Sequence, residues 1–215
     1  RAFGISLRLH YSWFIVFALV TWGLVANYLP SAYPGWDPTL RLIAGLVTSL
    51  LFFGSVLAHE LMHSIVAQSA GIPVKSITLF IFGGLAEITS EPKQPQVEFR
   101  MALAGPLTSL LLGGIFLAIH YWATSLPEAI TAVAFWLGWI NVFLAGFNLI
   151  PGFPLDGGRV FRSILWWRSG NLKNSTKIAS TVGRVVGYMF IFAGIWMIFL
   201  GQWLNGIWLA IIGWF

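Results

Sequence analysis

Residues 40–71 read LRLIAGLVTSLLFFGSVLAHELMHSIVAQSAG, an apolar run that carries HELMH at positions 59–63. The run is longer than the roughly 20 residues that a helix needs to cross a bilayer. Ionisable side chains are costly inside a membrane, so this placement indicates a functional group. Positions i and i+4 share one face of a helix, so His59 and His63 can grip one zinc ion while Glu60 lies beside them as a general base.

The composition indicates a membrane protein. Hydrophobic residues make up 58% of the 215 residues and charged residues 9%, against about 25% charged residues in a soluble domain. We therefore predict an all-α polytopic membrane protein with about six transmembrane helices. The expected spans are residues 11–29, 40–71, 99–122, 130–149, 178–200 and a segment of 13 residues that begins at Trp203. Because that segment is too short to cross and the chain begins with Arg1, we expect a fragment of a longer protein.

The basic residues predict the orientation. If the N-terminus is cytoplasmic, every lysine and arginine except Arg41 falls on or near the inner side. The net charge of +5 is then a topology signal and gives no reason to expect nucleic-acid binding. This orientation puts His63 roughly 12 Å and His59 roughly 18 Å from the cytoplasmic edge of their span. We expect a multi-pass protein of the plasma or inner membrane, with the metal group in the bilayer toward the cytoplasm.

A zinc ion that activates water needs a third protein ligand and an open position. The chain has no cysteine, so that ligand must be a histidine or a carboxylate. Most candidates fall in predicted loops, at span ends or at the membrane surfaces: His10, Asp37, Glu87, Glu91, Glu98, His120 and Glu128. Glu60 and Asp156 remain. Asp156 lies in NLIPGFPLDGGR (148–159), whose prolines prevent a regular helix and whose glycines permit sharp turns, so its carboxylate can be aimed inward.

The HELMH sequence in the second predicted span, the segment 148–158 after the fourth, and the spacing between them resemble the site-2 protease family of intramembrane zinc metalloproteases. The resemblance covers essentially the whole chain. It implies that His59, His63 and Asp156 hold one Zn²⁺ ion per chain. It also implies that Glu60 is the base and that Asn148 hydrogen-bonds the substrate or the developing oxyanion. We accordingly expect residues 1–215 to be a single transmembrane metalloprotease core, in a family whose longer members continue into cytoplasmic regulatory modules.

Residues 74–88, VKSITLFIFGGLAEI, combine β-branched and aromatic residues with turn-like glycines, which predicts a short hairpin between the second and third spans. In the related family a comparable Gly-Gly segment forms a sheet near the active site. We hypothesise that the edge around Phe82, Gly83 and Gly84 pairs with an unwound substrate, because strand addition presents an extended backbone. The alternative is a hairpin that only plugs the cytoplasmic face.

Three further segments have structural interpretations. Residues 104–109 and the spacing of Gly183 and Gly187 predict close helix packing, which we favour over a direct catalytic role. The basic cluster from Arg159 to Lys177 is expected to be a loop that faces anionic lipid.

The favoured function is hydrolysis of a peptide bond within or near a transmembrane segment of a membrane-protein substrate. Water activated by zinc and deprotonated by Glu60 would attack the peptide carbonyl. A purely structural zinc site, which would only link two spans, would not require Glu60. Two other classes remain open. Intramembrane histidines and acids also mark ion paths in transporters or metal-ion carriers, although no inverted repeat is visible. An inactive relative could instead serve as a binding scaffold.

Overall fold

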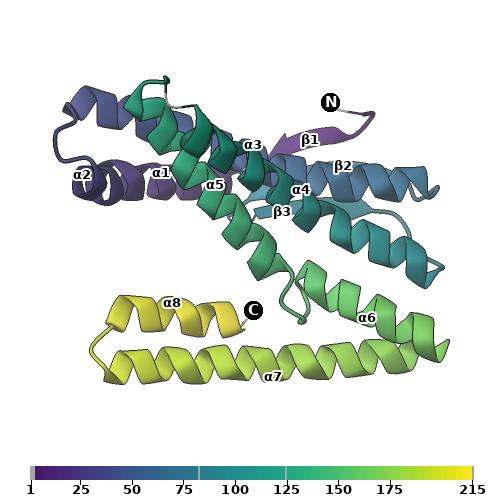
Figure 1. Cartoon of the computed structure of the whole chain (residues 1–215). Coiled ribbons are helices and arrows are strands. Elements are labelled where there is room, and N and C mark those ends of the chain that lie inside the picture. Colours follow the sequence, from purple (N-terminus) through teal and green to yellow (C-terminus); the bar gives the residue numbers. More distant parts are fainter. Residues whose placement is uncertain (1–2, 82, 124, 215) are drawn as a thin grey trace. The chain divides into compact units, whose positions relative to one another are not determined.

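Five helices in the described part of the chain are long and apolar enough to cross a membrane. The computed structural model describes residues 3–81, 83–123 and 125–214. The five helices are residues Tyr11–Ala32, α3 (Pro38–Ser69), α4 (Pro95–Trp122), α5 (Glu128–Asn148) and α7 (Leu172–Phe199), and the elements are labelled in Figure 1. The prediction of an all-α polytopic membrane protein is confirmed. The sixth expected segment forms the shorter α8 (Trp203–Trp214), so the count of six spans is approximate.

Polar residues mark where several helices begin. The first span comprises α1 (Tyr11–Gly23), a π-helical segment (Leu24–Tyr28) and α2 (Leu29–Ala32), and the ring of His10 accepts a hydrogen bond from the Ser12 amide at its start. Asp37 caps α3 by accepting from the Thr39 amide at 2.6 Å. Such caps satisfy amides that have no partner within the first helical turn.

The chain divides into two compact units. The first contains Arg1–Glu91 and Ala104–Gly146, and the second contains Pro92–Leu103 and Phe147–Phe215. Helix α4 therefore contributes its first turns to the second unit and its remainder to the first, and α5 ends in the second unit.

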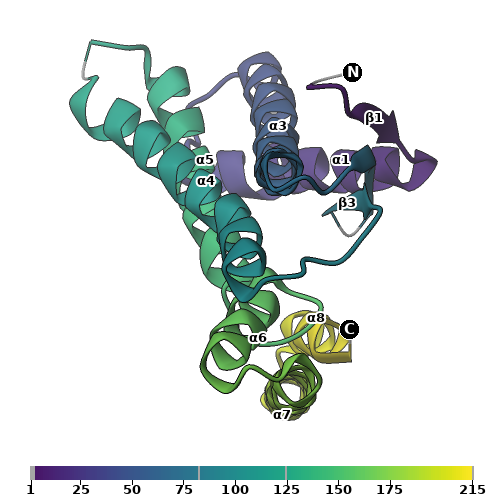
Figure 2. The same cartoon turned by 90° about the vertical axis from the view of Figure 1, so that its right-hand side faces the viewer.

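The first unit contains a small sheet in the order β1-β2-β3, formed by β1 (Ser6–Leu9), β2 (Val74–Phe80) and β3 (Gly83–Ile88). Strands β2 and β3 are antiparallel, so the predicted hairpin is confirmed. Strand β1 pairs in parallel with β2 and was not predicted from the sequence. Figure 2 shows the sheet beside α1 and α3, which it contacts.

An aromatic cluster joins the sheet to the helices of the first unit. The Trp13 ring of α1 lies 5.1 Å from the Phe17 ring and 5.2 Å from the Phe53 ring of α3, measured between centroids. Val56 of α3 and Leu79 of β2 complete the buried group. Aromatic pairs at this separation add to the stabilisation from burial, so the cluster fixes the sheet against the helix that carries HELMH.

Small and polar residues hold α4 and α5 in the same unit. A Cβ placed at Gly113 would meet the Gly138 carbonyl oxygen at 3.0 Å, so the two backbones lie close together. The fully buried Asn141 of α5 donates from Nδ2 to the Ser55 hydroxyl of α3 at 3.2 Å. Ser55 lies one turn before His59, so this bond ties α5 to the histidine-bearing part of α3.

The second unit corrects one prediction. Residues from Arg159 to Lys177, which we expected as a loop, form most of helix α6 (Asp156–Ser169) and the beginning of α7. Helix α6 ends at Gly170, which adopts the left-handed conformation (φ 66°) that favours glycine, and Asn171 then caps α7. The loop prediction considered only the charges, whereas Trp166 and neighbouring apolar residues give this stretch an amphipathic helical pattern.

Helices α7 and α8 run side by side (Figure 1) and are held together by glycines. A Cβ at Gly194 would meet the Gly206 carbonyl oxygen and Ala210 of α8, and a Cβ at Gly187 would meet the Gly213 carbonyl oxygen at 2.7 Å. The prediction of close packing at Gly187 is confirmed.

Gly183 also packs closely, against another segment of the same unit. A Cβ at Gly183 would lie 3.0 Å from the Cα of Gly152. The proline-containing turn before Asp156 is thereby held against α7.

Candidate metal centre

The two histidines of HELMH lie side by side on α3. Their ring centroids are 4.8 Å apart and the rings are nearly perpendicular. His59 is 3% exposed and His63 is 6% exposed. The one-turn spacing thus places both imidazoles on one buried face, as the sequence predicted.

Ser109 orients one of these imidazoles. The Nδ1 atom of His59 and the fully buried Ser109 hydroxyl on α4 are 2.9 Å apart. A hydrogen bond at Nδ1 fixes the ring and leaves Nε2 for a metal. The sequence favours packing over a direct catalytic role for residues 104–109, so the contact between Ser109 and His59 was missed. Position 109 is one helical turn after Gly105, so both residues lie on the same face of α4. That spacing could have indicated that Ser109 also faces His59.

Gly105 brings the backbone of α4 close to both imidazoles. A Cβ at this position would be closer to Nε2 of His59 and Nε2 of His63 than real contacts allow. Only glycine fits without displacing them. The two Nε2 atoms therefore lie together under one turn of α4, where they could share an ion.

Glu60 is enclosed from the sheet side. A Cβ at Gly84 of β3 would lie 2.8 Å from the Cδ atom and 3.2 Å from the Oε1 atom of Glu60. Gly83 has a different role, because its φ of 122° lies in the region that favours glycine and a Cβ there would meet nothing within 4 Å. Phe82, the third residue of the predicted substrate edge, lies outside the described residues.

Asp156 is the first residue of α6 and is partly buried. Two glycines shape the turn before it. A Cβ at Gly157 would clash with the carbonyl oxygens of Leu149 and Ile150, and a Cβ at Gly158 would lie 2.7 Å from the Phe153 nitrogen. A carboxylate at a helix N-terminus is stabilised by the unpaired amides of the first turn. The turn therefore presents the Asp156 side chain at a fixed place in the second unit.

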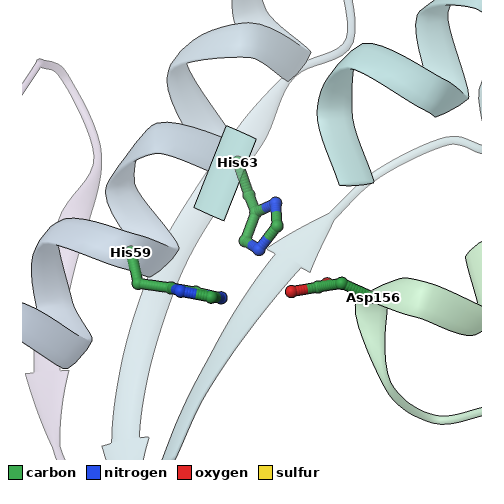
Figure 3. Close-up of side chains that lie close together, drawn as sticks. All are labelled: His59, His63 and Asp156. Atoms are coloured by element: carbon green, nitrogen blue, oxygen red, sulfur yellow. The ribbon is translucent and has the colours of Figure 1, made fainter. Parts of the chain in front are cut away.

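One group of side chains among the described residues could hold a metal ion. It consists of His59, His63 and Asp156, whose ligand atoms lie within 4.8 Å of one another, and Figure 3 shows these side chains close together. Two imidazole nitrogens and one carboxylate oxygen are a donor set that suits zinc, with the fourth position open in catalytic sites. Glu60 does not belong to this group. Asn148 is the last residue of α5 and is partly buried.

Several known proteins that resemble this chain are named as zinc metalloproteases. The family model described as Peptidase family M50 matches residues 47–130 and 117–194. Two proteins named "Putative zinc metalloprotease", Rip3 of Mycobacterium tuberculosis and sll0528 of Synechocystis, are 40% and 43% identical over 100% and 99% of this chain. The chain spans about half the length of these relatives, 55% of each.

A solved structure agrees in both fold and sequence. The site-2 protease of Methanocaldococcus jannaschii matches with a TM-score of 0.63 and 31% identity, over 99% of this chain and 91% of that one. Together with the five apolar helices, this similarity identifies a multi-pass membrane protein. The resemblance to the site-2 protease family, which was based on HELMH and the segment 148–158, is confirmed.

Proposed function

Because this chain belongs to peptidase family M50, we propose that it is the core of an intramembrane zinc metalloprotease. Its reaction would be hydrolysis of a peptide bond within or near a transmembrane segment of a membrane-protein substrate. In this proposal His59, His63 and Asp156 are the ligands of one zinc ion, Glu60 is the general base, and Asn148 contacts the reacting carbonyl.

The observation that carries this proposal is the enclosure of Glu60 beside the histidine pair. Gly84 leaves room for the carboxylate and Gly105 leaves room for both imidazoles. A purely structural zinc site needs ligands but no additional carboxylate next to them. An acid held in a fitted space beside two imidazoles, inside an apolar helix, favours catalysis.

The residues have separate tasks in the reaction. When bound, zinc would acidify a water molecule and polarise a carbonyl oxygen. Glu60 would accept the proton of the attacking water and later donate it to the leaving amine. The Asn148 amide would donate a hydrogen bond to the oxyanion as it forms. Ser109 would keep His59 in the tautomer whose Nε2 is free of a proton.

We also propose that the substrate enters as an extended strand along β3. This strand forms one edge of the sheet and β1 forms the other. Gly84 of β3 packs against Glu60, so a strand added to β3 would run past the proposed base.

The two edges of the sheet allow a direct test of this entry route. A photo-crosslinking residue at Leu85 of β3, which is 63% exposed, should capture a bound substrate in the Glu60→Gln background. The same residue at Leu7 of β1, which is 38% exposed, is the control. Capture at Leu7 alone would contradict strand addition at β3.

The remaining proposals concern location and assembly. The distribution of lysine and arginine supports a cytoplasmic N-terminus and a plasma or inner membrane location, with the metal site toward the cytoplasm. We further propose that residues 1–215 act as a single catalytic core and that a C-terminal regulatory module completes the longer protein. A transporter or metal-ion carrier has no support among the relatives named above.

Comparing the purified protein with its Glu60→Gln variant tests the catalytic assignment. We expect the variant to retain zinc, because Glu60 lies outside the proposed ligand set. Its cleavage of a single-span test substrate should fall by roughly 10²- to 10⁴-fold, the usual contribution of a general base. Unchanged cleavage would contradict the role of Glu60, and metal transport that survives the substitution would favour a carrier. A protein that binds zinc but never cleaves would favour a scaffold.

A further inference from the structure

Glu98 is a buried acid that neither the ligand set nor the mechanism uses. It lies in the first turn of α4, in the second unit, and none of its surface is exposed. Arg162 of α6 donates from Nε to the Oε1 atom of Glu98 at 2.8 Å and also bonds this oxygen through its terminal nitrogen Nη2. Arg159 places its own Nε 4.0 Å from the same oxygen. From the sequence alone, Glu98 is one of several acids predicted in loops or at span ends.

A buried pair of this kind fixes geometry more than it adds stability. Withdrawing two charges from water costs nearly as much as their attraction returns, and apolar residues of similar volume often serve as well. The second carboxylate oxygen, Oε2, is buried without a hydrogen-bond partner within the described residues. The pair by itself is therefore weak evidence of net stabilisation.

Arg162 connects the pair to the segment that carries Asp156. Its guanidinium carbon lies 5.4 Å from the centroid of the Phe153 ring, within the range of cation–π attraction. Phe153 belongs to the turn just before Asp156, and Arg162 lies on the helix that Asp156 begins. Arg162, on the helix that follows Asp156, thus contacts the turn that precedes Asp156, and Glu98 anchors its guanidinium to α4.

We propose that Glu98 is a positioning residue, which holds Asp156 in place for metal binding through Arg162. This inference rests on the proposed function, since it requires Asp156 to be a ligand. Metal ligands commonly depend on neighbouring groups that orient them, and loss of such a group weakens metal affinity by roughly 10- to 100-fold.

The test separates positioning from simple stabilisation. Zinc affinity is measured by competition with a chromophoric chelator, and the melting temperature is measured on metal-free protein. The variants are Glu98→Gln and the double replacement Glu98→Met with Arg162→Met, in which both charges disappear together. Glu128→Gln is the matched control, because Glu128 accepts a hydrogen bond from the Trp36 ring at 2.9 Å and lies in the first unit, at the start of α5.

We expect Glu98→Gln to bind zinc about 10- to 100-fold more weakly. The double variant should regain the melting temperature of the parent and keep the weakened affinity. Glu128→Gln, which also removes one negative charge at a hydrogen-bonded position, should leave zinc affinity unchanged. The positioning role would be overturned if Glu98→Gln bound zinc as tightly as the parent protein. It would also be overturned if the double variant regained both the parental stability and the parental zinc affinity. Neither result would contradict the proposed function. A parent protein that binds no zinc would contradict the proposed function and this inference with it.

Discussion

At the scale of single residues, the candidate centre depends on glycines that leave room for ionisable side chains. Gly105 lies against the two imidazoles and Gly84 against Glu60. In both cases glycine is needed because it has no Cβ, and not because its backbone is flexible. The two positions can therefore be tested separately, one for metal binding and one for the base.

Replacing Gly105 by alanine should weaken zinc binding. The added methyl group would lie too close to the Nε2 atoms of both imidazoles, so at least one imidazole must shift. Disturbing the orientation of a ligand predicts a decrease in zinc affinity of roughly 10- to 100-fold, measured by chelator competition. Gly114→Ala is the control on the same helix, because a Cβ there would meet nothing within 4 Å. Equal affinities in the two variants would show that Gly105 does not shape the site.

Replacing Gly84 by alanine should affect catalysis without removing the metal. The methyl group would displace the carboxylate of Glu60, and misplacement of a catalytic group by about 1 Å can cost 10²-fold in rate. We expect kcat to fall by about this factor while zinc content stays at the parental level. Gly54→Ala, at an open position of α3, should change neither quantity. A loss of zinc together with activity would argue against a specific effect on the base.

The local sequence pattern predicted the arrangement of the two histidines but not the contacts of Glu98 and Ser109. Helical spacing alone placed His59 and His63 on one face, because that geometry is set by the chain itself. Burial of Glu98 depends on Arg162, which is 64 residues away, so no local pattern could reveal it. Ser109 was missed for a related reason, because small residues indicate close packing without indicating which side chain they approach.

At the scale of elements, strand β1 shows the same limit. The hairpin of β2 and β3 was predicted because its partners are adjacent in sequence. Strand β1 pairs in parallel with β2 across the first two spans, and only the tertiary structure brings the two together. The basic stretch after Asp156 was misassigned for another reason, since its charges favoured a loop although its apolar residues follow a helical period.

The pairing of α7 and α8 gives a prediction at this scale. Gly194→Val would insert a branched side chain between two backbones that approach at Gly206. Overpacking of this kind typically costs about 1–3 kcal/mol, so the variant should unfold at a lower denaturant concentration. Gly114→Val, at a position where a Cβ would meet no atom within 4 Å, should have a much smaller effect. Equal destabilisation by both substitutions would contradict close α7–α8 packing at Gly194.

At the scale of the whole molecule, the orientation in the membrane can be tested directly because the chain has no cysteine. Single cysteines introduced as Ser125→Cys, Ser90→Cys and Ser169→Cys occupy exposed positions. With a cytoplasmic N-terminus, an impermeant thiol reagent should label Ser125→Cys on intact cells. It should label the other two only after permeabilisation. The reverse pattern would contradict the topology that the basic residues predict.

The central claim is that two histidines of α3 and the first residue of α6 share one zinc ion. X-ray absorption at the zinc edge of the purified protein, compared with its Asp156→Ala variant, tests this most directly. We predict one zinc per chain with two imidazole ligands and one carboxylate ligand, and loss of the carboxylate contribution in the variant. A zinc environment that is the same in both proteins, or a parent protein without zinc, would contradict the account.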